Sequence, residues 1–537
     1  MGDVAGARSC AGLDPSSLES SCMTWQAELD DIARRRKLAE NLGGADKVAR
    51  HRANGKLTVR ERVEGLLDAG SFAEIGGLAG FPEYDAEGRL TGFTPANVVC
   101  GTGSIEGRTV FVTGDDFTVR GGANDGGLRD KFKFAETNAK RWRIPLIRLV
   151  DGTGGGGSVK HLETLGRTYL PDVPDMTEIL DAMSEIPVVA LGLGSVAGMG
   201  AARVCASHYS MMAKGTSQLF AAGPPVVARI GETVDKEQLG GSSIHAKNGT
   251  IDDEVASEAE AFARARRFLS YLPPNVFELP PRGATSDPAD RTDGKLIDAV
   301  PREQRKVYRM RPILSSVLDA DSWFEIGKGW GRSVITGLGR LDGWPVAILA
   351  SDPYHYGGAW TADACRKAIR LVDLAETFHL PVVHFVDIPG FLIGTDAERS
   401  GVMRFGTQAL TALRQSRVPW CAIMVRKAFG MAGLSQRNGG EAFVRYAWPS
   451  AQWGSLPIAG GVEAAYRAVI EAAPDPAAKR AEIEARLEAF QAPVRTAEAF
   501  GVEEIIDPRE TRRHLTAFAN MAAPLRATGR PSFGYRP

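Results

Sequence analysis

A long internal repeat constrains the fold of this chain more than any other feature. Val98–Gly154 aligns without a gap on Val334–Gly390, 236 positions later, and 15 of the 57 aligned columns are identical. After a four-residue slip the alignment resumes, so that Gly198-Met199 meets Gly430-Met431. The repeat is longer than the periods of solenoid proteins. It predicts two domains of one fold, with the chemistry placed where the two copies face each other.

The identical columns are mainly glycines, prolines and aspartates, which set turns and strand ends. They pair Gly101 with Gly337, Gly103 with Gly339, Gly107 with Gly343, Asp116 with Asp352, Pro145 with Pro381, and Asp151 with Asp387. The same backbone turns are therefore expected in both copies.

Length and composition agree with this division. A chain of 537 residues is too long for one core and fits two domains of about 250 residues. The net charge of −1 gives no reason to expect nucleic acid or an anionic membrane surface as a partner. The six cysteines form no CxxC pair, which argues against a zinc ribbon or a disulfide framework and favours a reducing cytoplasm. No apolar run approaches the roughly 20 residues of a membrane-spanning helix.

Strands alternate with helices in both copies, which predicts an α/β fold in each half. The first copy reads as two strands over 98–115, a helix near 127–142, a fully apolar strand in IPLIRLVDG and a further strand in IPVVALGLGS. The second copy repeats this order, with a helix near 361–379 and strands in LPVVHFVDIPG and VPWCAIMV. After residue 476 we expect a polar helix and then a Pro-rich tail.

Segments outside the repeat set the expected domain boundaries. Residues 1–22 lack periodicity and are expected to be a loose extension, whereas 23–70 are helical in pattern. A stretch rich in Pro, Gly and Asp at 273–300 marks the linker. The two domains are therefore predicted to be 23–280 and 281–537.

In each copy a glycine-containing turn follows an apolar strand and opens a helix, in VVALGLGSVAGMGAAR and in CAIMVRKAFGMAGLSQ. Such a turn presents free backbone N–H groups at the positive end of a helix, which suits an anion or a developing oxyanion. Donors aimed at a thioester oxygen would stabilise an enolate. The other interpretation is a tight strand–helix connection in which glycine allows close packing. The recurrence of Gly-Met at the same place in both copies favours the catalytic interpretation.

A second candidate region follows the central strand of each copy. It reads DGTGGGGSVKHL from Asp151 and DIPGFLIGTDAERSGVMRFG from Asp387. The glycines of the first stretch would let the backbone approach a ligand closely, or would form a mobile lid. A flexible surface loop explains the same composition equally well.

Several common catalytic patterns do not occur. There is no GxxxxGK[ST] loop for ATP, and no GxSxG or SxxK-like pattern of a serine enzyme. The eight histidines show no paired metal-ligand spacing. His384 lies within an apolar strand and is expected to be a core residue and not a base.

Motifs of one known family occur here in the family order. The most specific is DIPGFLIGTDAERSGVMRFG followed by RKAFGMAG, close to D-x-P-G-F-x-x-G followed by R-K-A-Y-G-G-A. Supporting matches are HRANGKLTVRERVEGLLDAGSF, LFAAGPPVV, LGGSSIH, YAWPSAQ and IIDPRETR. Over 23–537 the chain resembles the carboxyltransferase (beta) subunits of biotin-dependent acyl-CoA carboxylases, above all the propionyl-CoA and methylcrotonoyl-CoA carboxylase branch.

The resemblance implies two tandem crotonase-like domains of the ClpP/crotonase ββα-superhelix type, the N-terminal one for acyl-CoA and the C-terminal one for carboxybiotin. Carried over by position, the first oxyanion hole falls on the N–H groups of Gly198 and Met199 and acts on the thioester enolate. The second falls on Met431 and Ala432 and acts on the ureido oxygen of biotin. Backbone dipoles and proximity then suffice, without a side-chain base or a metal ion. The expected substrate-binding positions are Gly154, Gly155, Gly156, Gly430 and Leu434.

The resemblance also implies partners. The chain has neither a biotinyl A-M-K-M motif nor an ATP-grasp pattern, so it is expected to need a biotin carboxylase and biotin carboxyl carrier (alpha) subunit. The family pattern is a hexamer built from dimers, with each active site between the N-terminal domain of one chain and the C-terminal domain of another. A cytoplasmic enzyme without a nucleic-acid or membrane partner is expected.

Three departures from the family pattern bear on the substrate. The family commonly has Gly-Gly where this chain has Gly198-Met199 and Gly430-Met431, which keeps the backbone N–H but adds a flexible thioether. After the second turn the propionyl-type A-Y-D-V-M becomes AGLS, so that Leu434 replaces an acid beside the acyl pocket. The usual D-S-G-G-A after the first central strand is DGTGGGG. We hypothesise a non-standard acyl specificity, for a larger or branched chain.

Other functions fit parts of the same pattern. The chemistry run in reverse would make the chain the carboxyltransferase subunit of a biotin-dependent acyl-CoA decarboxylase or transcarboxylase, because direction depends on the partner. Loss of turnover through the altered Gly-Gly positions would leave a non-catalytic scaffold of the same fold, without saturable acyl-CoA binding. A biotin-free hydratase fits least, since such enzymes need one crotonase-like domain and acidic side chains.

Overall fold

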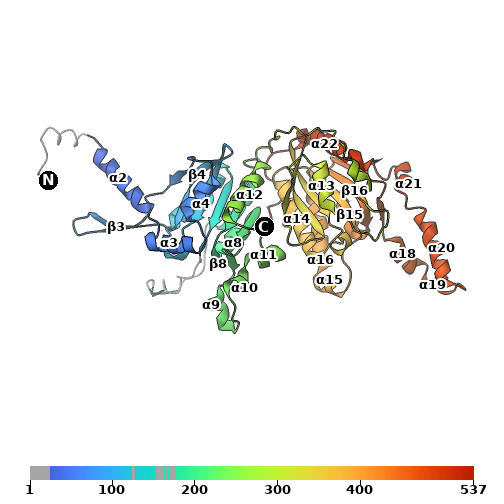
Figure 1. The fold of residues 1–537 in the computed structure, drawn as a ribbon, viewed down its shortest axis with the longest axis horizontal. Coiled ribbons are helices and arrows are strands. Elements are labelled where there is room, and N and C mark those ends of the chain that lie inside the picture. Colours follow the sequence, from blue (N-terminus) through green and yellow to red (C-terminus); the bar gives the residue numbers. More distant parts are fainter. Residues whose placement is uncertain (1–23, 124–126, 153–161, 164–165, 169–175) are drawn as a thin grey trace.

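The computed structural model describes residues 24–123, 127–152, 162–163, 166–168 and 176–537. The expected loose extension at 1–22 and the glycines at 154–156 lie outside the described residues. Two sheet-based halves lie side by side, the N-terminal one coloured blue to green and the C-terminal one yellow to red (Figure 1).

The N-terminal half is built on a seven-stranded sheet in the order β1-β4-β5-β6-β7-β9-β11. The pairings of β1 with β4 and of β4 with β5 are antiparallel, and all later pairings in the sheet are parallel. These strands are β1 (Ala73–Ile75), β4 (Val98–Ile105), β5 (Arg108–Asp115), β6 (Leu146–Val150), β7 (Val188–Gly192), β9 (Tyr209–Ala213) and β11 (Asp253–Val255). Two short sheets accompany it, β2 (Gly80–Tyr84) with β3 (Leu90–Pro95) and β8 (Ser195–Ala197) with β10 (Gln218–Phe220).

The C-terminal half repeats this topology in the order β12-β13-β14-β15-β16-β17-β19, with β18 added beside β16. Its first two pairings are again antiparallel and the others parallel. The strands are β12 (Phe324–Ile326), β13 (Val334–Leu341), β14 (Trp344–Ser351), β15 (Val382–Ile388), β16 (Trp420–Phe429), β17 (Phe443–Ala447), β18 (Gln452–Gly454) and β19 (Glu504–Ile505).

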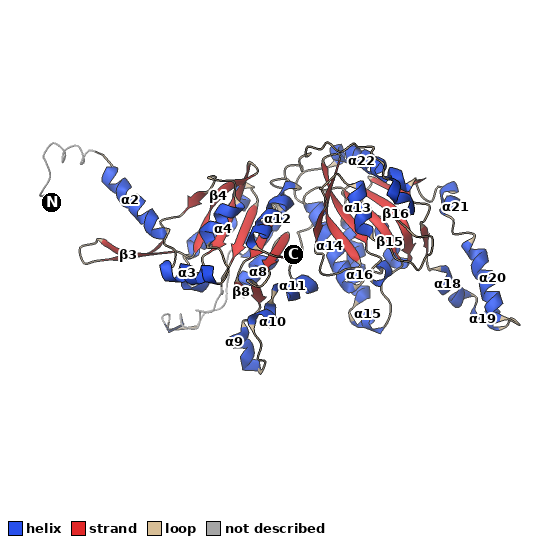
Figure 2. Ribbon diagram, viewed as in Figure 1, coloured by secondary structure: helices blue, strands red, loops and turns tan. Residues whose placement is uncertain are grey.

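Helices cover the faces of both sheets (Figure 2). The helices of the N-terminal half are α2 (Gln26–Ala39), α3 (Ala45–Ala53), α4 (Val59–Leu66), α5 (Arg129–Trp142), α7 (Met176–Asp181), α8 (Met199–Cys205), α9 (Pro224–Val227), α10 (Lys236–Gly240), α11 (Ser242–Asn248) and α12 (Glu258–Ser270). Those of the C-terminal half are α13 (Met310–Val317), α14 (Ala362–Thr377), α15 (Thr395–Arg399), α16 (Val402–Gln415), α17 (Gly430–Gly433), α18 (Ile458–Ala465), α19 (Arg467–Glu471), α20 (Pro476–Glu488), α21 (Pro493–Glu498) and α22 (Thr511–Ala522).

The sequence repeat is also a repeat of the backbone. The aligned strands β4 and β13 have the same length, as do β5 and β14. A Cβ added at Gly101 would lie 2.2 Å from Ala73 O, and one added at the aligned Gly337 would lie 2.3 Å from Phe324 O. Both glycines are therefore required because an edge strand passes too close for any side chain.

The expected Pro-rich tail after residue 476 is wrong in part. The segment contains α22, whose apolar residues recur every three or four positions and bury Leu515, Phe518, Ala519 and Ala522. That spacing is typical of an amphipathic helix, and it packs against the core of the C-terminal half.

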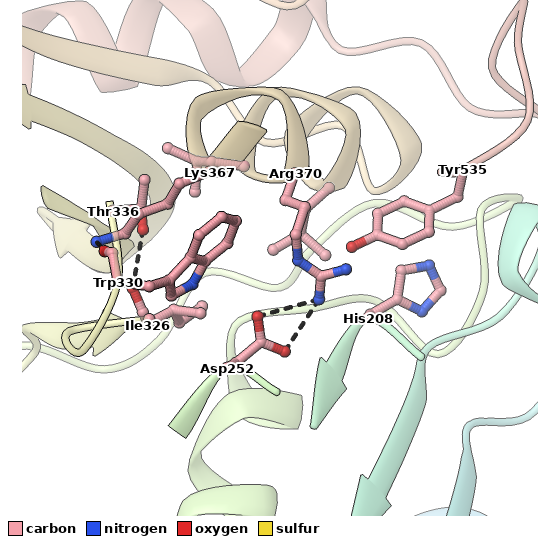
Figure 3. Close-up of a pocket in the computed structure, with 11 residues that line it drawn as sticks. His208, Asp252, Ile326, Trp330, Thr336, Lys367, Arg370 and Tyr535 are labelled. Carbon is pink, nitrogen blue, oxygen red and sulfur yellow. Dashed lines mark hydrogen bonds and ion pairs between the residues drawn. The ribbon is translucent and has the colours of Figure 1, made fainter. Parts of the chain in front are cut away.

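The two halves share a packed seam. Arg370 on α14 forms an ion pair of 3.0 Å with Asp252, which precedes β11, and both side chains are largely buried (Figure 3). Tyr535, close to the C-terminus, packs its ring 4.3 Å from that of His208 between the halves. Buried residues of both sheets belong to one hydrophobic cluster. The halves therefore form one continuous core and are not loosely tethered.

Some helices make few buried contacts. In α2 the buried residue is Ala39, and in α20 it is Ile483. Both helices project from the body of the molecule, one at each end (Figure 1). Among the described residues, no helix is both long enough and apolar enough to cross a membrane.

The repeat glycines give a direct test of the close strand crossing. Replacing Gly337 by Ala places a methyl group 2.3 Å from Phe324 O, and should destabilise the protein by about 2 kcal/mol or more. Gly460 is the matched control, since an added Cβ there meets nothing within 4 Å and Ala favours its helix by about 0.5–1 kcal/mol. Thermal unfolding should show a lower midpoint for Gly337→Ala and an unchanged or higher one for Gly460→Ala.

Candidate active site

The two predicted turns occupy equivalent places at the carboxyl ends of strands. In the N-terminal half, β8 leads through Gly198 into α8, and in the C-terminal half β16 leads directly into α17. Gly198 has φ 57° and ψ −118°, and Gly430 has φ 61°. A positive φ of this kind is readily adopted by glycine alone, so the Gly of each Gly-Met pair is fixed by the backbone.

The N–H groups of the first turn are not all free. Gly198 N donates to Phe220 O at 3.1 Å, so this N–H is already used within the fold. The expectation that Gly198 supplies an oxyanion donor therefore needs amending. Its N–H is paired with β10, and the local sequence around Gly198 does not reveal this partner. Met199 and Gly200 stand in the first turn of α8, where N–H groups have no intrahelical acceptor.

At the second Gly-Met turn, Met431 and Ala432 lie within the first helical turn of α17. Their N–H groups likewise lie where a helix leaves its donors unpaired. The Met431 side chain is 49% exposed, whereas Ala432 is fully buried. The thioether predicted to enter the site thus lies at the surface of the turn.

A solvent-open pocket of about 590 Å³ adjoins this second turn. Two predicted binding residues, Gly430 and Leu434, line it together. The remaining lining residues are Met424, Ala428, Gly433, Gln436, Arg445, Trp453, Gly454, Gly501 and Val502. Its size and mainly apolar wall are typical of a small-molecule site.

A buried carboxylate holds the strand that carries the second turn. Asp387, at the end of β15, accepts hydrogen bonds from Arg426 Nε at 3.1 Å and from Lys427 N at 3.1 Å. Tyr308 OH donates to the same carboxylate at 2.9 Å. Burial and the neighbouring carboxylate raise the pKa of Tyr308 well above its usual value, so the hydroxyl stays a donor.

The aligned Asp151 is held in the same way by a different element. Arg62, on α4, donates from Nη1 to Asp151 Oδ2 at 2.9 Å and from Nη2 to Leu193 O at 3.0 Å. Nε of the same guanidinium donates to Glu258 at 2.8 Å. The residue aligned with Arg426 is Gly194, where an added Cβ would lie 1.7 Å from Asp151 Oδ1. The glycine therefore makes room for the carboxylate that α4 neutralises.

A basic pocket of about 550 Å³ lies in the N-terminal half. Its lining residues are Lys47, Arg50, His51, Asn54, Phe117, Thr118, Arg120 and Gly121. The His51 ring stacks on Phe117 with centroids 6.0 Å apart, and Lys56 Nζ lies 5.2 Å from the same ring. Burial lowers the pKa values of His51 and Lys56. We refer to this cavity as the basic pocket.

Close backbone packing connects the basic pocket with the first turn. A Cβ at Gly122 would lie 2.7 Å from Gly152 Cα, and Ala197 N donates to Gly152 O at 3.3 Å. Gly198 follows Ala197 directly, and Gly122 follows Gly121 of the pocket lining. Backbone contacts through Gly152 thus connect the segment that lines the basic pocket with the segment that leads into the turn.

The structure locates most of the residues predicted from sequence. Met199 lies at the first turn, and Met431, Ala432, Gly430 and Leu434 lie together at the second; Gly154, Gly155 and Gly156 fall outside the described residues. Sequence reasoning missed the arginines Arg62 and Arg426. The identity of Asp151 and Asp387 in the repeat could have pointed to these arginines, because two buried aspartates require cationic partners. Within the described part of the chain, no His, Cys, Asp and Glu side chains are grouped to hold a metal ion.

Comparisons with known proteins agree with this geometry. The carboxyl transferase domain family model matches residues 50–530. A propionyl-CoA carboxylase carboxyltransferase subunit of Haloferax mediterranei is 33% identical, over 93% of this chain and 96% of its own length. A biotin-dependent acetyl-/propionyl-coenzyme A carboxylase beta5 subunit of Mycobacterium tuberculosis is also 33% identical, over 83% and 82%.

A solved structure shows the same architecture. The transcarboxylase 12S hexamer with methylmalonyl-coenzyme A bound superposes with a TM-score of 0.84 at 29% identity, over 96% of this chain and 98% of that one. The crotonase-like α/β fold expected from the sequence is thereby confirmed. The chain belongs to the carboxyl transferase domain family, as a carboxyltransferase (beta) subunit of the biotin-dependent acyl-CoA carboxylase type.

Proposed function

We propose that this chain transfers a carboxyl group between carboxybiotin on a partner subunit and the α carbon, or the vinylogous γ carbon, of an acyl-CoA. The observation that carries the proposal is the pair of equivalent turns, each opening a helix beside a buried aspartate–arginine pair. Two such turns supply two sets of fixed N–H donors. A transfer between two carbonyl-type substrates needs one set for each.

The N-terminal half serves the acyl-CoA. Met199 and Gly200 donate their N–H groups to the thioester oxygen and stabilise the enolate formed when the α-proton leaves. The basic pocket supports this assignment, because Lys47 and Arg50 suit the phosphates of coenzyme A and Phe117 offers a ring for stacking. The backbone contacts through Gly152, between the segment that lines this pocket and the segment that leads into the turn, support one site for both ends of the substrate.

The C-terminal half serves the biotin. Its pocket fits the group, since an apolar wall with Trp453 and Leu434 suits the bicyclic ring and the donors of Met431 and Ala432 suit the ureido oxygen. Biotin, when bound, brings the carboxyl group and accepts the proton in exchange. The chain's own residues orient the two substrates and stabilise negative charge on both oxygens.

The complete site forms between two chains. Large apolar side chains are exposed around the second turn: Met431 is 49%, Leu434 50%, Leu456 57% and Ile393 86% exposed. All four follow the carboxyl ends of neighbouring strands β15, β16 and β18. An exposed apolar group of this size indicates a contact surface, and the similar transcarboxylase 12S is described as a hexamer. We propose that these four exposed side chains contact the N-terminal half of a second copy.

The acyl specificity differs from that of propionyl-type relatives. Leu434 lines the pocket at the second turn, which in the shared site faces the acyl group held by the second copy, at a position where the propionyl pattern has an acid. Replacing a charge by an apolar side chain favours a larger or branched acyl group, because a desolvated carboxylate no longer opposes it. The transcarboxylase 12S likeness makes transfer in the opposite direction the second candidate, and the partner decides between the two.

A reverse assay tests the reaction and names the acyl class. Purified chain, free biotin and a panel of carboxyacyl-CoAs (malonyl, methylmalonyl, methylglutaconyl and bulkier esters) are incubated, and release of acyl-CoA is followed. We expect biotin-dependent loss of the carboxyl group, faster with the bulkier esters than with malonyl- or methylmalonyl-CoA. Fastest turnover of the two small esters would contradict the specificity.

Combined with CoA-ester binding, the same assay separates an active site from a disabled one and from a scaffold, which would show no saturable binding. Saturable binding of the CoA esters without turnover would point to a site disabled at Met199 and Met431, and the double change of both residues to Gly should then restore activity. Inactivity that persists in this variant across the whole panel would contradict carboxyl transfer.

The basic pocket provides a second prediction. Changing Lys47 and Arg50 together to Met should raise the KM for the carboxyacyl-CoA about tenfold, because two charge-assisted contacts to phosphate are lost. The KM for biotin should not change. A dephospho-CoA ester is the matched control, since its affinity should fall less in the variant; an equal KM for CoA ester in both proteins would rule out the assignment.

A further inference from the structure

Two residues at one aligned position of the repeat, on the central strand of each half, support the two turns. Arg148 on β6 and His384 on β15 occupy aligned positions of the two central strands. Each is in register with an alanine of the next strand, Ala190 or Ala422. The two side chains are 0% and 1% exposed. They therefore start from equivalent points below the helices that the turns open.

In the N-terminal half this position reaches the far end of α8. Arg148 Nη1 donates to Arg203 O at 3.2 Å and to Ala206 O at 2.6 Å. Arg148 Nε pairs with Glu136 at 2.8 Å, and Glu136 also pairs with Arg203. Because α8 has seven residues, fixing its last carbonyls also fixes the direction of its first N–H groups.

In the C-terminal half the equivalent position reaches the equivalent backbone. His384 faces the backbone of Ser435, the residue aligned with Arg203. Its ring also packs edge-on against Trp420, with centroids 6.0 Å apart, and Trp420 Nε1 donates to Gln436 O at 2.9 Å. Ser435 Oγ then donates to Ala432 O at 2.7 Å. This chain of contacts leads from the central strand to the residue that carries an oxyanion donor.

The two supports differ in chemistry. Arg148 is part of a buried charged network, in which Arg148 and Arg203 lower the pKa of Glu136 although burial opposes this. Burial lowers the pKa of His384 to about 3, so this side chain is neutral at physiological pH. Trp420 is fully buried beside it. The second turn thus rests on an uncharged aromatic pair and the first on an ionic network.

We propose that Arg148 and His384 are paired positioning residues, each holding the oxyanion turn of its own half, with Trp420 assisting His384. Each support acts on one substrate, so that the acyl-CoA side and the biotin side are set independently. This assignment of substrates to halves rests on the proposed function above.

The test compares a removing and a conservative change at each position. His384→Leu deletes the contact to Ser435, and His384→Gln keeps a donor of similar reach. We expect the KM for biotin in the reverse assay to rise about tenfold in His384→Leu, with recovery in His384→Gln. The Kd for a CoA ester, measured by calorimetry, should not change in either variant. Trp420→Phe, which removes the bond to Gln436 O and part of the ring volume, should move the KM for biotin in the same direction.

The first turn should give the opposite pattern. Arg148→Met should weaken CoA-ester binding about tenfold and leave the KM for biotin unchanged, and Arg148→Lys should recover part of the affinity. Thermal unfolding identifies variants that fail to fold. If the Arg148 variants do so, the His384 and Trp420 variants alone decide the proposal.

The outcomes separate this proposal from the proposed function. An active wild type whose folded variants shift both substrates equally, or neither, would overturn the positioning roles alone. Absence of biotin-dependent acyl-CoA release in the wild type that persists after Met199 and Met431 are both changed to Gly would overturn the proposed function and the substrate assignment together. Segregated shifts, biotin for His384 and CoA ester for Arg148, would support both.

Discussion

The structure depends on a buried aspartate paired with arginine at the end of each central strand. A carboxylate taken out of water is costly unless a fixed partner neutralises it, and Asp151 and Asp387 are both fully buried. Arg62 pairs with the first at 2.9 Å and Arg426 with the second at 3.1 Å. Each pair links the end of a central strand to the neighbouring strand or connection that leads into a turn. The positions of the backbone donors follow from these pairs.

The two halves solve one geometric problem with different side chains. Arg426 comes from the strand that carries its own turn, whereas Arg62 comes from a helix and pairs with the Asp151 carboxylate, which fills the space beside Gly194. The two copies therefore share the backbone fold and differ in the arginines that hold it in place. In the proposed function, this separation lets one turn serve a thioester and the other a ureido group, because neither set of supports constrains the other. The proposed catalysis by fixed N–H groups needs no side-chain base at either turn.

Much of the fold could be predicted because the repeat preserves glycines where strands cross, as at Gly101 and Gly337. The contacts that complete the site depend on distant segments. Gly198 N is used by Phe220 O, and the strand around Arg148, expected to be fully apolar, contains a buried arginine neutralised by Glu136. Local periodicity contains no information on such pairs. Residues 198 and 430, by contrast, were identifiable because a positive φ selects glycine.

In the proposed site, the first turn of one chain works with the second turn of another. Mixing two inactive variants, Gly198→Ala and Gly430→Ala, tests this arrangement, since each strains one turn and leaves the other intact. After dissociation and random reassembly, a symmetric dimer with shared sites should recover about one quarter of the wild-type rate, because half of the dimers are mixed and each contains one intact site. Recovery to that level would support the shared site. Activity no higher than that of either variant alone would show that each chain works by itself and would contradict the account.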